Sequence, residues 1–130
     1  MTTQYILKNS GGTFYHKDKE MSIPHRENGH AFEYSNGDKY WYIDGKLHRE
    51  DGPAIEHANG SREWYLYGKL HREDGPARIY SSGKKEWYLH DGEVTEEQHK
   101  RLTKKEPTIL IEGKAFTVAQ LKALIEKATI

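Results

Sequence analysis

The sequence predicts a mainly β protein: a repetitive antiparallel β-hairpin sheet, then a short helix, then a C-terminal element of two strands and a helix. Three observations predict this fold. A motif recurs every 23 residues, each copy carries glycine-containing turn signals, and the segments between the turns are rich in aromatic residues. We expect one twisted sheet of about six to eight strands.

The repeat is built around a histidine-containing heptapeptide. HREDGPA occupies His48–Ala54 and again His71–Ala77, and residues 25–31 read HRENGHA. Because chance does not produce such a periodicity, equivalent residues should occupy equivalent places in successive structural units. Three tryptophans keep the same 23-residue step: Trp41, Trp64 and Trp87.

Each unit contains two turn signals, an Asn-Gly pair such as residues 59–60 and an Asp-Gly pair such as residues 44–45. These dipeptides supply the positive φ angles that tight hairpin turns require. Alternation along residues 39–43 places Trp41 on one face of a strand and Tyr40 and Tyr42 on the other. Each unit is therefore predicted to be a β-hairpin, and successive hairpins should extend one sheet.

In such a sheet, equivalent side chains form ladders. Strands lie about 4.8 Å apart, so residues one hairpin apart lie about 10 Å apart. We assign the tryptophan ladder and the loop glycines and prolines to the structural core of the repeat. These residues are Trp41, Trp64, Trp87, Gly52, Pro53, Gly75 and Pro76.

This unit resembles the MORN repeat, with an aromatic pair, a Gly-Lys turn, a histidine loop and a closing Asn-Gly. The matching residues are Trp41-Tyr42, Gly45-Lys46-Leu47-His48 and Asn59-Gly60. The closer resemblance is to a variant with GKLHREDGPA at its centre, found in uncharacterised proteins of tailed phages, large DNA viruses and some bacteria. HREDGP replaces the usual His-Gly-x-Gly at residues 48–53. Over residues 21–92, the resemblance implies a hairpin sheet with a scaffolding or binding role and no catalytic residue.

The two ends of the array depart from the repeat. Ten residues separate Tyr15 from His25, against seven in the complete units, so we infer a three-residue insertion near residues 17–21. After Trp87 the Asp-Gly pair at 91–92 comes one position late, and no HREDGPA follows. Atypical terminal units are expected, because a sheet edge must be protected against further pairing.

The remaining residues predict two helices and a hairpin. Thr95 and Gln98 have capping-box spacing, which predicts a helix over 94–102 before a linker. Residues 108–116 predict a hairpin, and Thr117 with Gln120 caps a second helix. We place the domains at 1–94 (units of about 15–40, 41–63 and 64–86, with a partial cap to 94), 95–106 and 107–130. The apolar face of the last helix either packs on the sheet or pairs with a second copy: Leu121, Leu124 and Ile125.

Composition disfavours several classes of function. Lys plus Arg and Asp plus Glu number 20 each, so no net charge favours DNA or anionic membranes. The chain has no cysteine, which excludes disulfides and thiolate zinc sites. No apolar run approaches the roughly 18 residues of a membrane span, and no signal-peptide pattern is present. We therefore expect a cytoplasmic protein, in the host cytoplasm if a phage encodes it.

Two constellations suggest chemistry, and each has a plainer explanation. The HRED tetrads resemble the His-Arg-Asp of a kinase catalytic loop, but the glycine-rich loop and the metal-binding Asp-Phe-Gly are missing. Histidines about 10 Å apart in a ladder cannot share one metal ion. We therefore expect structural loops held by arginine–carboxylate bonds, with no enzyme activity, metal or cofactor.

Binding is the function that remains. Stacked tyrosines beside cations suit a nucleotide or single-stranded nucleic acid, but zero net charge favours a surface that contacts protein. We expect a phage-type accessory protein that binds and modulates a host protein, such as a defence component. The alternatives are a sponge for nucleotides or nucleic acid, and a virion or self-assembling protein that associates through the sheet edge or terminal helix. The residues expected on the displayed surface are Tyr42, Tyr65, Tyr88, His48, Arg49, His71 and Arg72.

Overall fold

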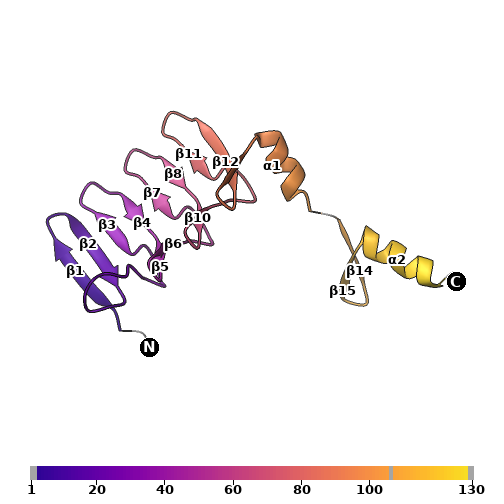
Figure 1. Cartoon of the computed structure of the whole chain (residues 1–130), viewed down its shortest axis with the longest axis horizontal. Coiled ribbons are helices and arrows are strands. Elements are labelled where there is room, and N and C mark those ends of the chain that lie inside the picture. Colours follow the sequence, from indigo (N-terminus) through magenta and orange to yellow (C-terminus); the bar gives the residue numbers. More distant parts are fainter. Residues whose placement is uncertain (1–2, 106, 129–130) are drawn as a thin grey trace. The chain divides into compact units, whose positions relative to one another are not determined.

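The computed structural model describes residues 3–105 and 107–128 of the chain, and Figure 1 shows its elements in chain order. The protein is mainly β with two helices, as the sequence predicts. Backbone contacts divide it into two units, Met1–Lys100 and Arg101–Ile130. The first unit contains the repeat array, and the second contains the C-terminal hairpin and helix.

One large antiparallel sheet forms most of the first unit. Its strands are β1 (Tyr5–Asn9), β2 (Gly12–His16), β3 (Phe32–Tyr34), β4 (Lys39–Tyr40), β7 (Ile55–Glu56), β8 (Arg62–Glu63), β11 (Arg78–Ile79), β12 (Lys85–Leu89) and β13 (Gly92–Val94). The nine strands follow the order β1-β2-β3-β4-β7-β8-β11-β12-β13. The sheet exceeds the predicted number of strands because the N-terminal residues add a hairpin of their own, β1 with β2.

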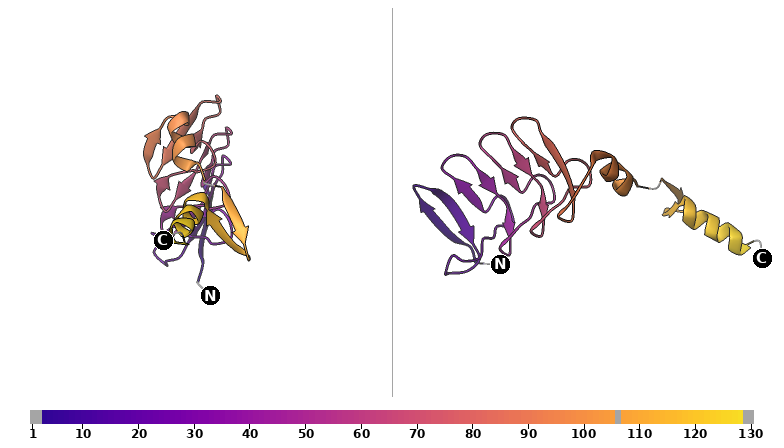
Figure 2. Two further views of the ribbon diagram at one scale, coloured as in Figure 1. Left: turned by 90° about the vertical axis from the view of Figure 1, so that its right-hand side faces the viewer. Right: turned by 45° about the horizontal axis from the view of Figure 1, so that its top comes forward.

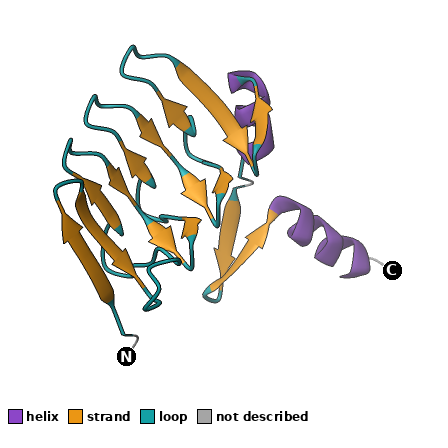
Figure 3. Cartoon of the chain, turned by 60° about the vertical axis from the view of Figure 1, so that its left-hand side comes forward, coloured by secondary structure: helices purple, strands orange, loops and turns teal. Residues whose placement is uncertain are grey.

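Each complete repeat unit also forms a smaller hairpin outside this sheet, visible as short strands in Figure 3. These hairpins are β5 (Tyr42–Ile43) with β6 (Lys46–Leu47), and β9 (Tyr65–Leu66) with β10 (Lys69–Leu70). The strand predicted over 39–43 is therefore interrupted at Trp41. The Trp41 N–H donates to the Ala54 carbonyl at 2.8 Å, and the Trp41 carbonyl accepts from the His48 N–H at 3.0 Å. The chain leaves the large sheet at this residue.

Successive units dock through the histidine loops, so that the hairpins follow one another along the array (Figure 2). His48 Nδ1 accepts a hydrogen bond from the Tyr67 N–H in the turn of the next unit, at 3.0 Å. The adjacent Gly68 N–H donates to the Leu47 carbonyl at 2.7 Å. The imidazole contact recurs in the other loops, at 2.9 Å from Asp44 N to His25 Nδ1 and at 3.0 Å from His90 N to His71 Nδ1.

The N-terminal unit keeps this geometry despite its insertion. The Tyr15 N–H donates to the Ala31 carbonyl at 2.8 Å, the contact that tryptophan makes in the complete units. The extra residues form a loop around the Asp18 side chain. Its carboxylate accepts hydrogen bonds from the backbone N–H groups of Ser22 at 2.9 Å and Ile23 at 2.7 Å. The Ser22 hydroxyl is the main cause that lowers the pKa of Asp18 to about 2. The insertion is therefore a local loop and does not shift the array.

The last turn of the array differs from the sequence prediction. The Asp-Gly pair placed this turn at residues 91–92, one position later than the 23-residue step requires. His90 and Asp91 form it, with φ angles of 50° and 69°, where the preceding unit has Tyr67 and Gly68 at 48° and 81°. The flanking pair Leu89 and Gly92 closes the turn. Asp91 adopts the left-handed conformation that glycine has in the other units, so the turn stays in register.

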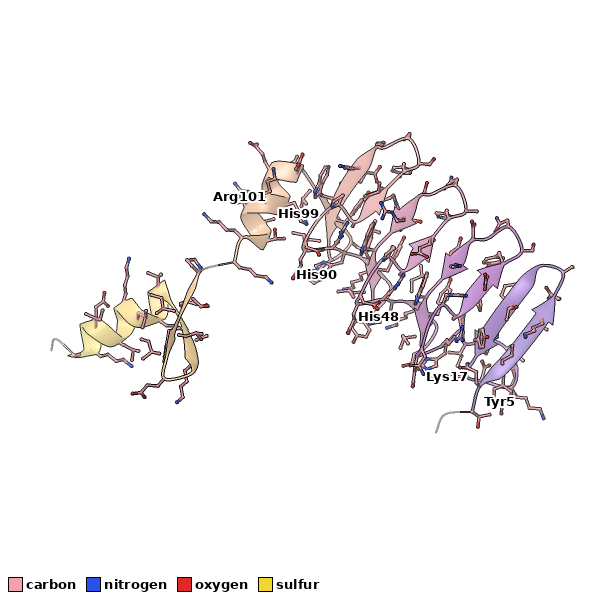
Figure 4. The ribbon with its side chains drawn as sticks, turned by 180° about the vertical axis from the view of Figure 1, so that it is seen from behind. Tyr5, Lys17, His48, His90, His99 and Arg101 are labelled. Carbon is pink, nitrogen blue, oxygen red and sulfur yellow. The ribbon has the colours of Figure 1, made fainter. Side chains whose placement is uncertain are left out.

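Helix α1 (Glu96–Thr103) replaces the histidine loop after the last hairpin. The predicted capping box is present: the Thr95 N–H donates to Gln98 Oε1 at 2.9 Å, and the Gln98 N–H donates to Thr95 Oγ1 at 3.1 Å. His99 is buried on the side of α1 that faces the array, and its Nε2 lies 2.6 Å from the Arg72 carbonyl oxygen (Figure 4). This imidazole anchors the helix on the last histidine loop.

The second unit contains β14 (Thr108–Ile111), β15 (Lys114–Thr117) and α2 (Val118–Ala128), the predicted order of strand, strand and helix. The predicted cap is present here too, with the Gln120 N–H donating to Thr117 Oγ1 at 3.1 Å. None of the described residues of α2 is buried. Leu110, Leu124 and Ile125 are exposed, whereas Phe116 and Leu121 are half-buried.

The core of the array is thin. Its fully buried residues are small: Ala31, Ala54 and Ala77 are all 0% exposed. The tryptophans that the sequence assigns to the core are only half-buried, as are Gly52, Pro53, Gly75 and Pro76. The tryptophan ladder is therefore only partly covered, because a single sheet has no second layer to enclose it.

Candidate functional site

The strand register sorts the side chains of the large sheet onto two faces. Residues that are Cα partners on successive strands share a face. One such row starts with aromatic residues and ends with ionic ones: Phe14, Phe32, Tyr40, Ile55, Glu63, Arg78 and Glu86. We call this surface the tyrosine face, because Tyr34, Tyr42, Tyr65, Tyr80 and Tyr88 flank the row.

The N-terminal half of the tyrosine face is a cluster of aromatic rings. Phe32 lies between Phe14 and Tyr42, with ring centroids 5.1 Å from each. Tyr34 and Tyr40 meet edge to face at 5.4 Å. Such contacts add to the area that the rings bury. This half of the face is therefore a surface of packed aromatic rings.

The C-terminal half is an ion-pair network centred on Arg78. Its guanidinium donates to Glu63 at 2.7 Å and to Glu86 at 3.4 Å, bridging three neighbouring strands. The hydroxyls of Tyr80 and Tyr88 each donate to Glu86 at 3.2 Å. Burial opposes ionisation of Glu86, but these hydrogen bonds outweigh it and hold the pKa of its carboxyl below the usual value.

A histidine extends the network towards the neighbouring hairpin. His57 lies between two carboxylates, with Nδ1 3.4 Å from Asp38 and Nε2 3.3 Å from Glu63. The Ala58 N–H donates to Asp38 at 2.7 Å, and this bond is the main cause that lowers the pKa of that carboxyl. The lowered pKa values of Asp38 and Glu86 stabilise both carboxylates as anions on one face, and Glu63 lies between His57 and Arg78 on the same face.

The tyrosines keep their protons. Burial raises the pKa of Tyr40, Tyr42, Tyr65 and Tyr88. Each hydroxyl remains a hydrogen-bond donor at neutral pH, attached to a ring that supplies apolar contact area. A half-buried row of tyrosines beside fixed carboxylates is suited to contacts with aromatic and basic side chains.

The opposite face carries the aromatic ladder, and each loop arginine covers one ring. The guanidinium carbon lies 3.9 Å from the ring centroid for Arg49 on Trp41, and 4.0 Å for Arg72 on Trp64. Asp51 accepts from Arg49 Nε at 3.0 Å, and the Pro53 carbonyl accepts from Nη1 at 3.1 Å. In the N-terminal unit, Arg26 lies 4.0 Å over Tyr15 in the same way.

The loop glycines have a steric purpose in this arrangement. A Cβ on Gly52 would lie 2.9 Å from Arg49 Cζ, and a Cβ on Gly75 would lie 3.0 Å from Arg72 Cζ. The guanidinium is thus held between an indole and a glycine. We call this arrangement, in which the loop holds its own arginine against the aromatic ring of the same unit, the arginine clamp. Its role in each unit is structural.

The structure corrects the prediction that the loop histidines are displayed. His48 and His71 are 9% and 5% exposed, because each ring inserts between two units to accept a turn N–H. Arg49 and Arg72 lie on the opposite side of the sheet from the tyrosines, with their donors engaged by their own loops. The seven predicted surface residues therefore do not form one site. Tyr42, Tyr65 and Tyr88 share one face, and Arg49 and Arg72 share the other.

The sequence prediction missed the polar members of the tyrosine face. Arg78 occupies the position of Phe32 and Ile55 in earlier units, and Glu63 and Glu86 occupy the position of Tyr40. The sequence did contain an indication of these residues. They stand at the repeat positions where the residue type changes from one unit to the next, although the units are otherwise similar.

A small hollow opens beside the network. It has a volume of about 280 Å³, and it is lined by His57, Asn59, Ser61, Glu63, Arg78 and Tyr80. Among the described residues, no group of three or more His, Asp or Glu side chains is arranged to hold a metal ion. No helix in the described part of the chain is long and apolar enough to span a membrane.

Comparisons with models of protein families, with curated proteins and with solved structures find no match for this chain.

Proposed function

We propose that this chain is a non-enzymatic protein-binding module whose contact surface is the tyrosine face. The observation that carries the proposal is the continuous row from the aromatic cluster to the Arg78 network, which spans the neighbouring strands of one sheet. Aromatic residues beside oriented charges are typical of protein contact sites. The resemblance to MORN-like phage proteins supports a more specific proposal, an accessory protein that modulates a host protein such as a defence component.

Charge favours a basic partner. The described part of the face carries the carboxylates of Asp38, Glu63, Glu86 and Glu93, against the guanidinium of Arg78 and the exposed ammonium of Lys84. The clamp arginines Arg49 and Arg72, which an anionic ligand would need, donate to their own loops. This geometry favours a protein with arginine, lysine or aromatic contact residues over a nucleotide or nucleic acid.

The test is quantitative affinity capture from a bacterial host lysate, with mass spectrometry of proteins and small molecules. Wild type is compared with Tyr65→Ala, on the tyrosine face, and with Arg62→Ala, the matched control on the opposite face of the same strand region. A true partner should be retained by the control and reduced about tenfold or more by Tyr65→Ala. Melting curves of both variants establish that they remain folded.

Two outcomes would contradict the proposal. Equal capture by wild type and folded Tyr65→Ala would exclude the tyrosine face as the contact surface. Co-purification of nucleotides that raise the melting temperature would favour the ligand-sponge alternative.

The second unit supports a further candidate function, self-assembly. Leu110, Ile125 and Leu124 are 74%, 63% and 52% exposed, and a unit of this size buries too little to be stable alone. Leu121, on the same helix, is half-buried. If this surface pairs with a second copy, sedimentation velocity should detect a dimer that Ile125→Lys dissociates, whereas a wild-type monomer at high concentration would exclude this candidate.

A further inference from the structure

The arginine clamps of the two complete units are neutralised by an aspartate of the same loop. Arg49 Nε donates to the Asp51 carboxylate, and Arg72 Nε donates to the Asp74 carboxylate, each at 3.0 Å. In the first loop, whose sequence is HRENGHA, Asn28 stands in the place of the aspartate. This loop therefore has the arginine of the clamp without its carboxylate.

The first clamp otherwise keeps the geometry of the others. Arg26 lies 4.0 Å over the Tyr15 ring, and its Nη1 donates to the His30 carbonyl at 3.2 Å, as Arg72 Nη1 donates to the Pro76 carbonyl at 3.2 Å. Within residues 3–105 and 107–128, Arg26 forms no salt bridge, and its Nε donates to no acceptor. A half-buried guanidinium is thus held in place with an unused donor and an unpaired charge.

Arg26 borders a hollow of about 380 Å³, lined by Thr3, Gln4, Tyr15, His25, Arg26, Glu27 and Asn28. The first unit differs here from the complete units in two residues: the phenol of Tyr15 replaces an indole, and the amide of Asn28 replaces a carboxylate. The amide and the hydroxyl are both hydrogen-bond donors. A guanidinium with further donors around it is suited to bind a carboxylate.

The acidic residue of this hollow does not exclude a carboxylate ligand. Glu27 is exposed, and its carboxylate lies 3.5 Å from His25 Nε2. Glu50 has the same position in the next loop, 3.6 Å from His48 Nε2, and the arginine of that loop still holds an aspartate. A second carboxylate can therefore reach the arginine beside the glutamate.

We propose that Arg26, Asn28 and Tyr15 form a receptor site for a carboxylate group, supplied by an acidic side chain of a partner protein or by a small organic acid. The carboxylate would accept from Arg26 Nε, as the loop aspartates do in the complete units. Tyr15 alternates along β2 with Phe14, which belongs to the tyrosine face, so this site lies on the opposite face. It does not depend on the function proposed for the tyrosine face.

The probe is N-acetyl-aspartate N-methylamide, added at constant ionic strength to the ¹⁵N-labelled full-length protein. The arginine Nε–H signals report on each clamp separately, and Arg49 and Arg72 are internal controls because aspartates already accept from their Nε. The probe should shift the Arg26 signal and leave the other two unchanged. The corresponding asparagine derivative keeps the shape but loses the charge, and it should bind at least about fivefold more weakly.

Two substitutions should remove the site and create it elsewhere. Asn28→Asp gives the first loop the carboxylate of the complete units, which should occupy Arg26 Nε and weaken probe binding about fivefold or more. Asp74→Asn should make Arg72 respond to the probe, because it frees Arg72 Nε and leaves the bond from Nη1 to the Pro76 carbonyl. Each variant places at this position a residue that another loop of the chain already has, so both should remain folded, which melting curves establish.

The proposal is overturned if the Arg26 signal does not move, if the asparagine derivative binds equally well, if all three arginines shift alike, or if folded Asn28→Asp binds as tightly as wild type. A silent Arg72 in folded Asp74→Asn also contradicts it. Acetate separates the two sources of the carboxylate: weaker binding than the capped aspartate assigns the site to a protein side chain, and equal or tighter binding to a small acid. Tyr65→Ala should leave the titration unchanged, so this result and the capture result are independent.

Discussion

At the residue scale, the repeated side chains are connectors. The loop arginine stacks on a tryptophan and the loop histidine accepts a backbone N–H from the next unit. The two contacts have different requirements. The arginine needs a glycine against its guanidinium, and the histidine needs an unprotonated Nδ1 to accept the backbone N–H. Each requirement leads to a prediction.

Gly52→Ala should destabilise the array by about 1–2 kcal/mol, because the new Cβ displaces Arg49 from the indole and from its hydrogen bonds. The Cβ would meet Arg49 Cζ at 2.9 Å. Urea unfolding measures the change in the free energy of unfolding. Gly11→Ala is the matched control, since its Cβ meets only the side-chain oxygen of Asn9. Equal stabilities of the two variants would show that the glycine is not needed to seat the arginine.

His71 should make the stability depend on pH. Burial, and then the neighbouring His90, lowers the pKa of His71 below its ordinary value of 6.5. The unfolded chain therefore binds a proton more readily than the folded chain, so this contribution to stability is fully present above pH 6.5 and is lost as the pH falls below it.

His71→Asn tests this prediction, because the amide oxygen can accept the His90 N–H and does not titrate. Between about pH 7.5 and 5, the melting temperature of wild type should fall further than that of the variant. Parallel curves for the two proteins would assign the pH dependence to other groups.

At the element scale, the short strands inside the large sheet are stable because each is hydrogen-bonded to a neighbour on both sides. Strands of two residues, such as β7 and β8, lie between neighbours in a nine-stranded sheet. The last turn shows the same dominance of context over local preference: Asp91 takes a φ of 69° because Leu89 and Gly92 pair across it. The sheet imposes the conformation that glycine adopts more readily in the other units.

Helix α1 depends on the array for its stability, since eight residues are too few for an isolated helix. His99→Ala removes the contact of its imidazole with the Arg72 carbonyl, so the helix amides should exchange with solvent about tenfold faster or more. Hydrogen exchange by mass spectrometry measures this. Lys100→Ala, an exposed neighbour, is the control and should leave the exchange nearly unchanged. Equal protection in both variants would mean that the capping box alone holds α1.

At the scale of the whole molecule, the array is one-dimensional: each unit contacts its neighbours through the same bonds. Deleting residues 41–63 removes one repeat and brings Tyr67 to the position of Asp44, so His25 keeps an acceptor contact with a turn N–H. This shorter protein should fold, with a smaller urea m-value because less surface is buried. Deleting residues 44–63 breaks the 23-residue register and is the control, which should not fold cooperatively. Circular dichroism and urea unfolding distinguish the two; failure of both deletions would contradict independent docking of the units.

Sequence patterns were enough to predict the repeat length, the hairpin units, the antiparallel sheet, and both capping boxes at Thr95 and Thr117. These features follow from periodicity and from local hydrogen bonding, which a linear sequence records directly. The prediction of displayed histidines failed for a physical reason: the imidazole of His48 is buried by the next unit, and only docking decides that.

The folded arrangement was needed to establish which charged side chains meet on one face and which cations are already engaged within the chain. Arg78 meets Glu63 and Glu86 from neighbouring strands, 15 and 8 residues away in sequence. The loop arginines are taken by the indoles at 3.9 and 4.0 Å, and the array ends before Trp87 receives one. Such contacts depend on strand register and on where the repeat stops, and these properties exist only once the hairpins are stacked.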